Sequence, residues 1–247
     1  MLKIFLCAMP TDKILKRFCL LCAAFLAFAA QPATGAIITF TDRASWLTAI
    51  GGATGGEDFN GFSSDTSFDN ATVGLADGMS IGTTGLIGFA TANKIDTPPV
   101  DTTTLGNLGI DGSGYARIRN DSVEDIVISF GAAIGAFGAD FQSISDITSR
   151  TEFELFSDTA LIDTIALAGA PLFTLRFFGF AADAGETITS IRLVQAVPVG
   201  SEVVNDGFGL DNIEFAAAAT TIPEPGALAL FAIAIAAVGI ARRGKTA

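Results

Sequence analysis

The side chains of this sequence that could do chemistry are carboxylates. The chain has no histidine, and its 3 cysteines, Cys7, Cys19 and Cys22, all lie near the amino end. A Ser-His-Asp triad, a Cys-His pair and a His-ligated zinc or iron site are therefore excluded from the rest of the chain. What remains is the chemistry of paired Asp and Glu side chains, which glycosidases use as acid and as nucleophile or base. No such pair stands out, so we expect no enzymatic activity, and a carboxylate-based enzyme that cleaves glycans stays the less favoured alternative.

The acidic residues are concentrated in the middle of the chain. Four of the 14 lysines and arginines precede residue 37 and three follow residue 221, whereas only Asp12 and Glu224 of the 26 acidic residues lie outside 37–221. This region therefore holds 7 basic and 24 acidic residues, a net charge of −17. Such a charge argues against nucleic acid and anionic lipid surfaces as partners. It fits a solvated extracellular surface, or one that binds calcium through oxygen ligands.

The amino end predicts export. Its successive parts are a basic segment, an apolar run of 13 residues and a group of small residues: Lys13, Lys16 and Arg17, then 18–30, then 33–36. This order is typical of a secretory signal peptide, here residues 1–36, with the cut expected after Ala36. The lead before Met9 leaves open whether translation starts at Met1 or at Met9. No cysteine would remain after the cut, so the mature chain would depend on its core rather than on disulfides.

The carboxyl end has three parts in order. They are Pro223-Glu224-Pro225, an uncharged apolar run at 227–241 and the basic residues Arg242, Arg243 and Lys245. The prolines keep the chain extended around Glu224, and the basic residues would stay on the cytoplasmic side of a membrane. As a helix the run would be about 22 Å long, shorter than a bilayer core of about 30 Å. The order predicts a short transmembrane helix that serves as a temporary anchor, with a permanent C-terminal anchor as the alternative.

This tail resembles the PEP-CTERM sorting signal of exported proteins in Gram-negative bacteria. The resemblance covers residues 222–245, and the residues that carry the motif are Pro223, Glu224, Pro225, Arg242 and Arg243. It implies that an exosortase, a membrane cysteine protease, recognises the tail and removes it. It also implies a membrane-anchored intermediate that ends at the cell surface or in the extracellular matrix, in a species that makes exopolysaccharide and biofilm.

The body, residues 37–216, has the pattern of an antiparallel β-sandwich. Its apolar segments alternate with polar residues, turn residues recur about every 10 to 15 positions, and no helical period is sustained. We expect one short helix, capped by Thr41 or Asp42 and ended by Gly51-Gly52, with Trp46 and Leu47 on its buried side. Phe should supply most of the core, and residues 217–221 form a linker to the tail. The expected strands are 37–40, 57–62, 79–81, 86–90, 115–119, 125–130, 135–141, 152–156, 161–167, 173–180, 188–194 and 208–215.

The second half of the body resembles the jelly-roll domains common among PEP-CTERM proteins. The residues that carry this resemblance are 177–180, 188–191 and 207–213. Such domains resemble carbohydrate-binding β-sandwiches and often hold a structural calcium between their first and last strands. The counterparts by position are Glu57, Asp58 and Asp211, with Asp206 a weaker candidate. The alternative is that Glu57 and Asp58 form a solvated edge and that Asp211-Asn212 caps a turn. The stretch Asp111-Gly112-Ser113-Gly114 is expected to form a hairpin turn.

The chain is poor in side chains that stack on sugar rings. Trp46 and Tyr115 are its only Trp and Tyr, and both are expected in the core. The leading hypothesis is therefore an exported structural or adhesive protein of the cell surface or matrix, with calcium as its one candidate metal. A carbohydrate-binding module is the alternative. The expected partners are exosortase, the membrane through the tail, and extracellular polysaccharide, but no nucleic acid.

Overall fold

The computed structural model describes most of the predicted body. The residues described are 36–84, 93–99, 110–120, 125–144, 151–167, 171, 173–183, 185–195 and 206–218. The predicted signal peptide up to residue 35, the predicted strand 86–90 and the sorting tail lie outside these ranges. Within them, no helix has the length and apolar character needed to cross a membrane.

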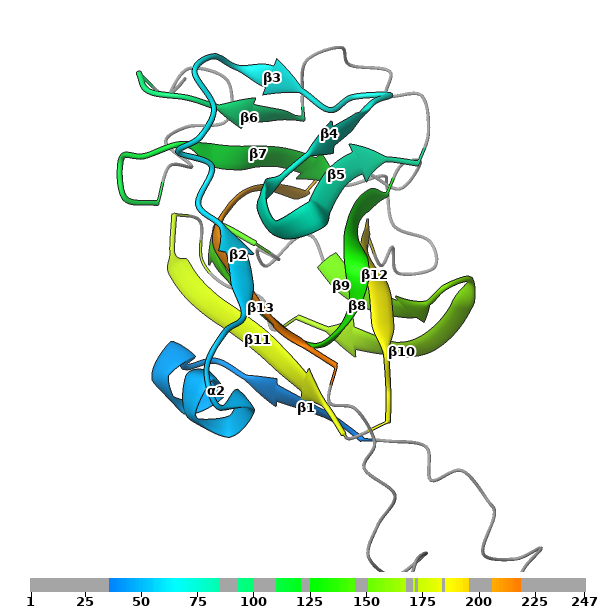
Figure 1. Ribbon diagram of the computed structural model, residues 1–247. Coiled ribbons are helices and arrows are strands. Elements are labelled where there is room, and N and C mark those ends of the chain that lie inside the picture. Colours follow the sequence, from blue (N-terminus) through cyan, green and yellow to red (C-terminus); the bar gives the residue numbers. More distant parts are fainter. Residues whose placement is uncertain are drawn as a thin grey trace, which may run out of the picture. The chain divides into compact units, whose positions relative to one another are not determined.

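Antiparallel strands dominate the described chain, together with one α-helix and one short 3-10 helix (Figure 1). All the strand pairs found there are antiparallel. The predicted antiparallel all-β body with a short N-terminal helix is thus confirmed, and its packing is consistent with a β-sandwich. The elements are β1 (Ile37–Phe40), α2 (Arg43–Ile50), β2 (Gly55–Glu57), β3 (Thr66–Ser67), β4 (Thr72–Gly74), η1 (Ala76–Gly78), β5 (Met79–Thr83), β6 (Lys94–Asp96), β7 (Tyr115–Asn120), β8 (Ile126–Gln142), β9 (Thr151–Ser157), β10 (Ala160–Ala166), β11 (Leu175–Ala182), β12 (Ile188–Gln195) and β13 (Asp206–Ala217).

The longest strand, β8, changes its neighbours halfway along. Residues 126–130 pair with β5 and β12, whereas residues 136–142 pair with β11 and β13. The sequence predicted two strands here, 125–130 and 135–141. The structure instead joins them into one strand of 17 residues. One strand therefore links two sets of neighbours, and its second half runs alongside the last strand, β13.

Helix α2 forms where its capping residues predict it. The Asp42 carboxylate accepts a hydrogen bond from the Ser45 N–H at 2.8 Å, and Gly51 adopts a left-handed conformation (φ 73°) that ends the helix. Trp46 is fully buried, and its indole N–H donates to the Phe180 carbonyl on β11 at 3.0 Å. The predicted inward position of Trp46 is confirmed, and this contact fixes the helix against β11.

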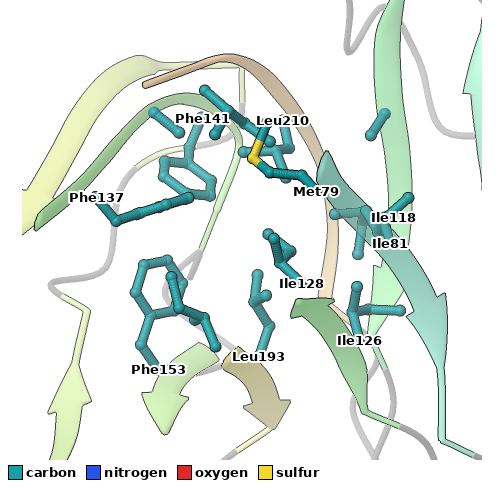
Figure 2. Packing of buried hydrophobic residues seen from close by; sticks show 14 of the residues in the cluster. Met79, Ile81, Ile118, Ile126, Ile128, Phe137, Phe141, Phe153, Leu193 and Leu210 are labelled. Carbon is teal, nitrogen blue, oxygen red and sulfur yellow. The ribbon is translucent and has the colours of Figure 1, made fainter. Parts of the chain in front are cut away.

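Isoleucine and phenylalanine side chains fill the centre of the core (Figure 2). The prediction that Phe supplies most of the core was wrong, because Ile is the more frequent of the two among the buried residues described. Phe137 of β8 stacks on Phe180 of β11, with ring centroids 5.9 Å apart, and meets Phe153 of β9 edge-on at 6.1 Å. Phe141 continues the row, with centroids 5.7 Å from Phe153 and 6.2 Å from Phe208 of β13. Because these rings come from four strands, the core holds β8, β9, β11 and β13 together.

A pair of glycines makes room for helix α2 on the sheet. Gly138 of β8 lies opposite Gly179 of β11, and the rings of Trp46 and Phe177 occupy the space above them. A Cβ atom on Gly138 would lie 2.7 Å from the Phe177 ring and 3.2 Å from the Trp46 ring. The packing of α2 against the sheet therefore depends on the absence of a Cβ atom in glycine at position 138.

Candidate functional site

A charged cleft of about 570 Å³ lies where β2, β8 and β13 meet. β13 pairs with β2 on one side, where Ile213 is opposite Glu57, and with β8 on the other, where Asp211 is opposite Asp140. The cleft thus joins one of the first strands of the body to its last. Its lining residues are Arg43, Gly56, Glu57, Asp58, Ala76, Asp140, Asn212, Ile213 and Glu214.

A bulge in β13 shapes this cleft. Between the pairs Asp211–Asp140 and Glu214–Gly138, β13 holds one residue more than β8. Asn212 takes up the extra length with a left-handed backbone (φ 48°), a conformation that Asn tolerates better than most residues. A bulge turns side chains away from the regular alternation. It lets Asn212 face the cleft, where its side-chain amide donates to the Asp140 carboxylate at 3.1 Å.

Asp211 is the most perturbed acid among the described residues. Its side chain is fully buried, one carboxylate oxygen accepts the Asn212 N–H at 2.6 Å, and the other lies 3.5 Å from the Ser113 hydroxyl. Burial raises the pKa of this carboxyl to about 7, against the effect of the Asn212 N–H. The negative charges of Asp111, Asp140 and Asp58 make smaller contributions to this raised pKa. Burial and these like charges thus both disfavour the ionised form of this carboxyl group.

Glu57 is buried and already holds two backbone groups. One carboxylate oxygen accepts the Phe59 N–H at 2.7 Å and the other accepts the Ala76 N–H at 2.7 Å. These bonds fix the turn after β2, where Phe59 has a left-handed backbone (φ 56°), and attach it to η1. Glu57 therefore has a structural role in the described chain, whether or not a cation joins it.

Two loops bring further carboxylates to Asp211. Asp58 is exposed and accepts the Asn60 N–H at 3.1 Å, and Asp111 accepts the Ser113 N–H at 2.9 Å. The bonds from Ser113 lower the pKa of Asp111, which keeps that carboxyl ionised. The predicted hairpin turn at 111–114 is a bend at the end of the long connection from β6 to β7, and it places Asp111 near Asp211. The sequence pattern of that turn had not indicated this position.

Arg43 of α2 supplies a positive charge to the cleft. Its guanidinium forms an ion pair with Asp140 at 3.0 Å and another with Glu214, and it donates to the Asn212 carbonyl at 3.1 Å. It also lies over the Phe177 ring, 4.7 Å from the centroid. Arg43 thus compensates Asp140 and Glu214. In the described part of the chain, it forms no ion pair with Asp58, Asp111 or Asp211.

The predicted calcium ligands lie at this cleft and beside it. Glu57 and Asp58 line it, and Asp211 lies close enough to Asp58 to feel its charge. The donor chemistry suits calcium, because all three offer carboxylate oxygens. Within the described ranges, however, no three His, Cys, Asp or Glu side chains converge as a metal-binding group. The side chain of Asp206, the weaker candidate, is outside what the structure describes.

Three cleft residues were missed from the sequence. They are Asp140, Glu214 and Arg43, which form the ion-paired side of the cleft. Asp140 had a signal, as the one charged residue in the otherwise small and apolar stretch 134–141. In the sequence, Glu214 and Arg43 look like ordinary surface charges. They come together only through the bulge in β13 and the packing of α2 against the sheet.

The two residues best suited to sugar stacking are buried. Trp46 and Tyr115 are both fully buried, which confirms their predicted place in the core. Among the described aromatic side chains, Phe173 stands out as exposed, at 55%. The sorting residues Pro223, Glu224, Pro225, Arg242 and Arg243 lie outside the described part of the chain.

Comparisons with known proteins give remote structural likenesses. No family model and no curated protein matches the chain. Among solved structures, the K1 cleaved adhesin domain of Lys-gingipain from Porphyromonas gingivalis is 15% identical, with a TM-score of 0.37 over 63% of this chain and 98% of that one. A glycoside hydrolase family 43 arabinoxylan arabinofuranohydrolase from Bacillus subtilis, in complex with cellotetraose, is 19% identical, with a TM-score of 0.29 over 46% of this chain and 23% of that one. Likenesses of this size carry no argument about function.

Proposed function

We propose that this chain is an exported structural or adhesive β-sandwich protein of the cell surface or extracellular matrix. An exosortase would recognise its PEP-CTERM tail and remove it after a membrane-anchored stage. The body would then remain associated with exopolysaccharide or biofilm. In this proposal the protein is not an enzyme.

The observation that carries the proposal is the order of parts in the tail. An extended Pro223-Glu224-Pro225 peptide offers main-chain groups to a protease, since its prolines prevent it from folding into a helix. The apolar run at 227–241 is short for a permanent span, and Arg242 and Arg243 would stop its passage through the membrane. These features suit a segment that is held in the membrane and then cut.

The tail proposal is tested by producing the chain with and without an exosortase. Replacing Pro223, Glu224 and Pro225 together by Ala should leave the protein full-length and membrane-bound in the host that has the enzyme, while the natural chain is shortened. Replacing Thr220 and Thr221 by Ala, just outside the motif, serves as the matched control. Equal processing of the motif variant and the natural chain would refute the role of the motif.

We also propose that calcium binds beside the cleft, with Glu57, Asp58 and Asp211 as ligands. What supports this is the position of the buried Asp211, whose pKa is raised to about 7 by burial and by the nearby negative charges of Asp111, Asp140 and Asp58. Calcium accepts six to eight oxygen ligands, including backbone carbonyls and water, so the side chains need not supply the whole set. Bound there, it would lower the repulsion among these acids and connect the strands at the two ends of the body.

A carbohydrate-binding module is the second candidate. It is favoured by the cleft, whose carboxylates, Arg43 and Asn212 could hydrogen-bond to sugar hydroxyls. The burial of Trp46 and Tyr115 counts against it, since sugar-binding sites use exposed aromatic rings. Pull-down with the polysaccharide of the producing cells, with and without calcium, separates the two candidates. Retention that Asp140→Ala abolishes would establish the module, and no retention in either condition would remove it.

A further inference from the structure

Two hydrogen bonds join Ala36, just before β1, to Asp183, just after β11. They bear on where the leader is removed. The register of β1 and β11, in which Ile37 lies opposite Ala182, continues outward to the pair Ala36 and Asp183. The Asp183 N–H donates to the Ala36 carbonyl at 3.1 Å. In return, the Ala36 N–H donates to the Asp183 side-chain carboxylate at 3.0 Å. The two residues are therefore joined in both directions.

The side chain of Asp183 does here what a backbone carbonyl would do in a regular ladder. The Asp183 carbonyl accepts the Glu186 N–H at 3.2 Å, in the turn that leads from β11 to β12. The carboxylate takes over as the acceptor for the Ala36 nitrogen. A carboxylate is a stronger partner than a carbonyl when the donor carries a positive charge.

We propose that the leader is cut between Gly35 and Ala36, and that Asp183 binds the α-ammonium group that this cut creates. In the reaction, water adds across the Gly35–Ala36 peptide bond. Gly35 leaves with the new carboxylate, and the proton released goes to the amine of Ala36. The existing amide–carboxylate hydrogen bond becomes an ion pair, with no change in the path of the chain.

These contacts place the cleavage site after Gly35, one residue earlier than the sequence predicted. A cut after Ala36 would remove the whole residue and leave the Asp183 N–H and carboxylate without these partners. A cut after Gly35 keeps both hydrogen bonds and adds a charge to one of them. It also meets the demand of signal peptidases for small residues, with Gly35 just before the cut and Ala33 two positions earlier.

The inference rests on the export step of the proposed function, and it is independent of what happens to the tail. The direct test is mass spectrometry of the amino-terminal peptide of the full chain, produced and exported in a Gram-negative host. We expect the peptide to begin at Ala36. A start at Ile37 would overturn the inference while leaving export intact, and an uncut leader would overturn both. The carboxyl-terminal peptide of the same sample reports separately on the tail.

The role of Asp183 is tested by the reactivity of the new amine. Lys94 is the only lysine between residues 36 and 221, and its ion pairs with Asp65 and Asp96 lie elsewhere, so it serves as an internal reference for an amine-labelling reagent. Asp183→Asn should speed labelling of the α-amine by about 1.5-fold to fivefold, the range expected for an exposed ion pair, and leave Lys94 unchanged. Asp163→Asn, on the exposed strand β10, is the control. Equal α-amine rates in the natural chain and Asp183→Asn would refute the ion pair.

Discussion

At the scale of single residues, Asp211 has an unusual environment. It is fully buried and close to the charges of Asp58, Asp111 and Asp140. Arg43 pairs with Asp140 and with Glu214. A carboxyl group in this position gains from a proton or from a cation. With a pKa of about 7, the two compete near neutral pH.

Asp211 should make stability depend on pH when calcium is chelated. Its folded-state pKa of about 7 lies above the ordinary value of 3.8, so the folded protein binds the extra proton. The stabilisation from that proton is complete below about pH 4 and is lost as the pH rises through 7, up to a ceiling of about 4 kcal/mol for about 3 pH units. Asp211→Asn should therefore be the more stable protein at pH 7.5, with an advantage that shrinks toward pH 4.

The measurement is urea denaturation between pH 4 and 8 in the presence of a chelator. Asp163→Asn, at an exposed position on β10, is the control, since the other carboxyl groups titrate in all three proteins. Parallel stability curves for Asp211→Asn and the natural chain would contradict the raised pKa.

At the scale of elements, the seat of α2 on the sheet decides where Arg43 stands. Trp46 packs against Phe177 with ring centroids 5.6 Å apart, and the same Phe177 ring supports the Arg43 guanidinium. Both rings need the open space over Gly138 and Gly179. The packing of α2, and with it the position of Arg43 in the cleft, thus depends on this pair of glycines.

Adding a methyl group at Gly138 should weaken the packing of α2 against the sheet. The new Cβ would meet the Phe177 ring at 2.7 Å, and such overpacking costs about 1–3 kcal/mol. Gly138→Ala should lower the free energy of unfolding by that amount and change the fluorescence of Trp46, the only Trp in the chain. Gly74→Ala on β4, where nothing lies within 4 Å of the new atom, is the matched control. Unchanged fluorescence and stability in Gly138→Ala would show that the helix is seated in some other way.

Local patterns predicted the elements better than the site. The Asp42 cap, the inward Trp46 and most of the alternating strands were predictable, because each depends on residues close in sequence. The predicted strand 57–62 was wrong, because β2 ends at Glu57 and the chain then turns at Phe59. The continuous β8 was not, since only its change of neighbours from β5 and β12 to β11 and β13 lets the strand pass Gly131. The bulge at Asn212 was not predictable either, because a bulge is defined by the register of the partner strand. The position of Asp211 among its acidic neighbours depends on the continuous β8 and on the bulge at Asn212.

At the scale of the whole molecule, the region 37–221 carries a net charge of −17 with no cysteine to cross-link it. Its cleft lies where β2 and β13, near the two ends of the body, pair with each other. A cation bound there would act at once on charge repulsion and on the closure of the fold. The proposed calcium therefore has a consequence for overall stability.

Chelation should lower the melting temperature of the protein at pH 7.5. A ligand present at about 100 times its Kd contributes about 2.7 kcal/mol, which corresponds to about 5–11 °C for a domain of this size. Asp211→Ala should abolish the difference between chelator and calcium, whereas Asp163→Ala, which lies on β10, should keep it. A natural chain whose melting temperature is the same in both conditions would remove calcium from the account.

The central claim is that the chain is exported and then processed at its tail, and the intact mass of the protein recovered from producing cells tests it most directly. We predict a mass that begins at Ala36 and ends between Pro223 and Gly226. A mass that runs to Ala247 would contradict the claim. It would make the tail a permanent anchor and the protein a membrane-tethered β-sandwich.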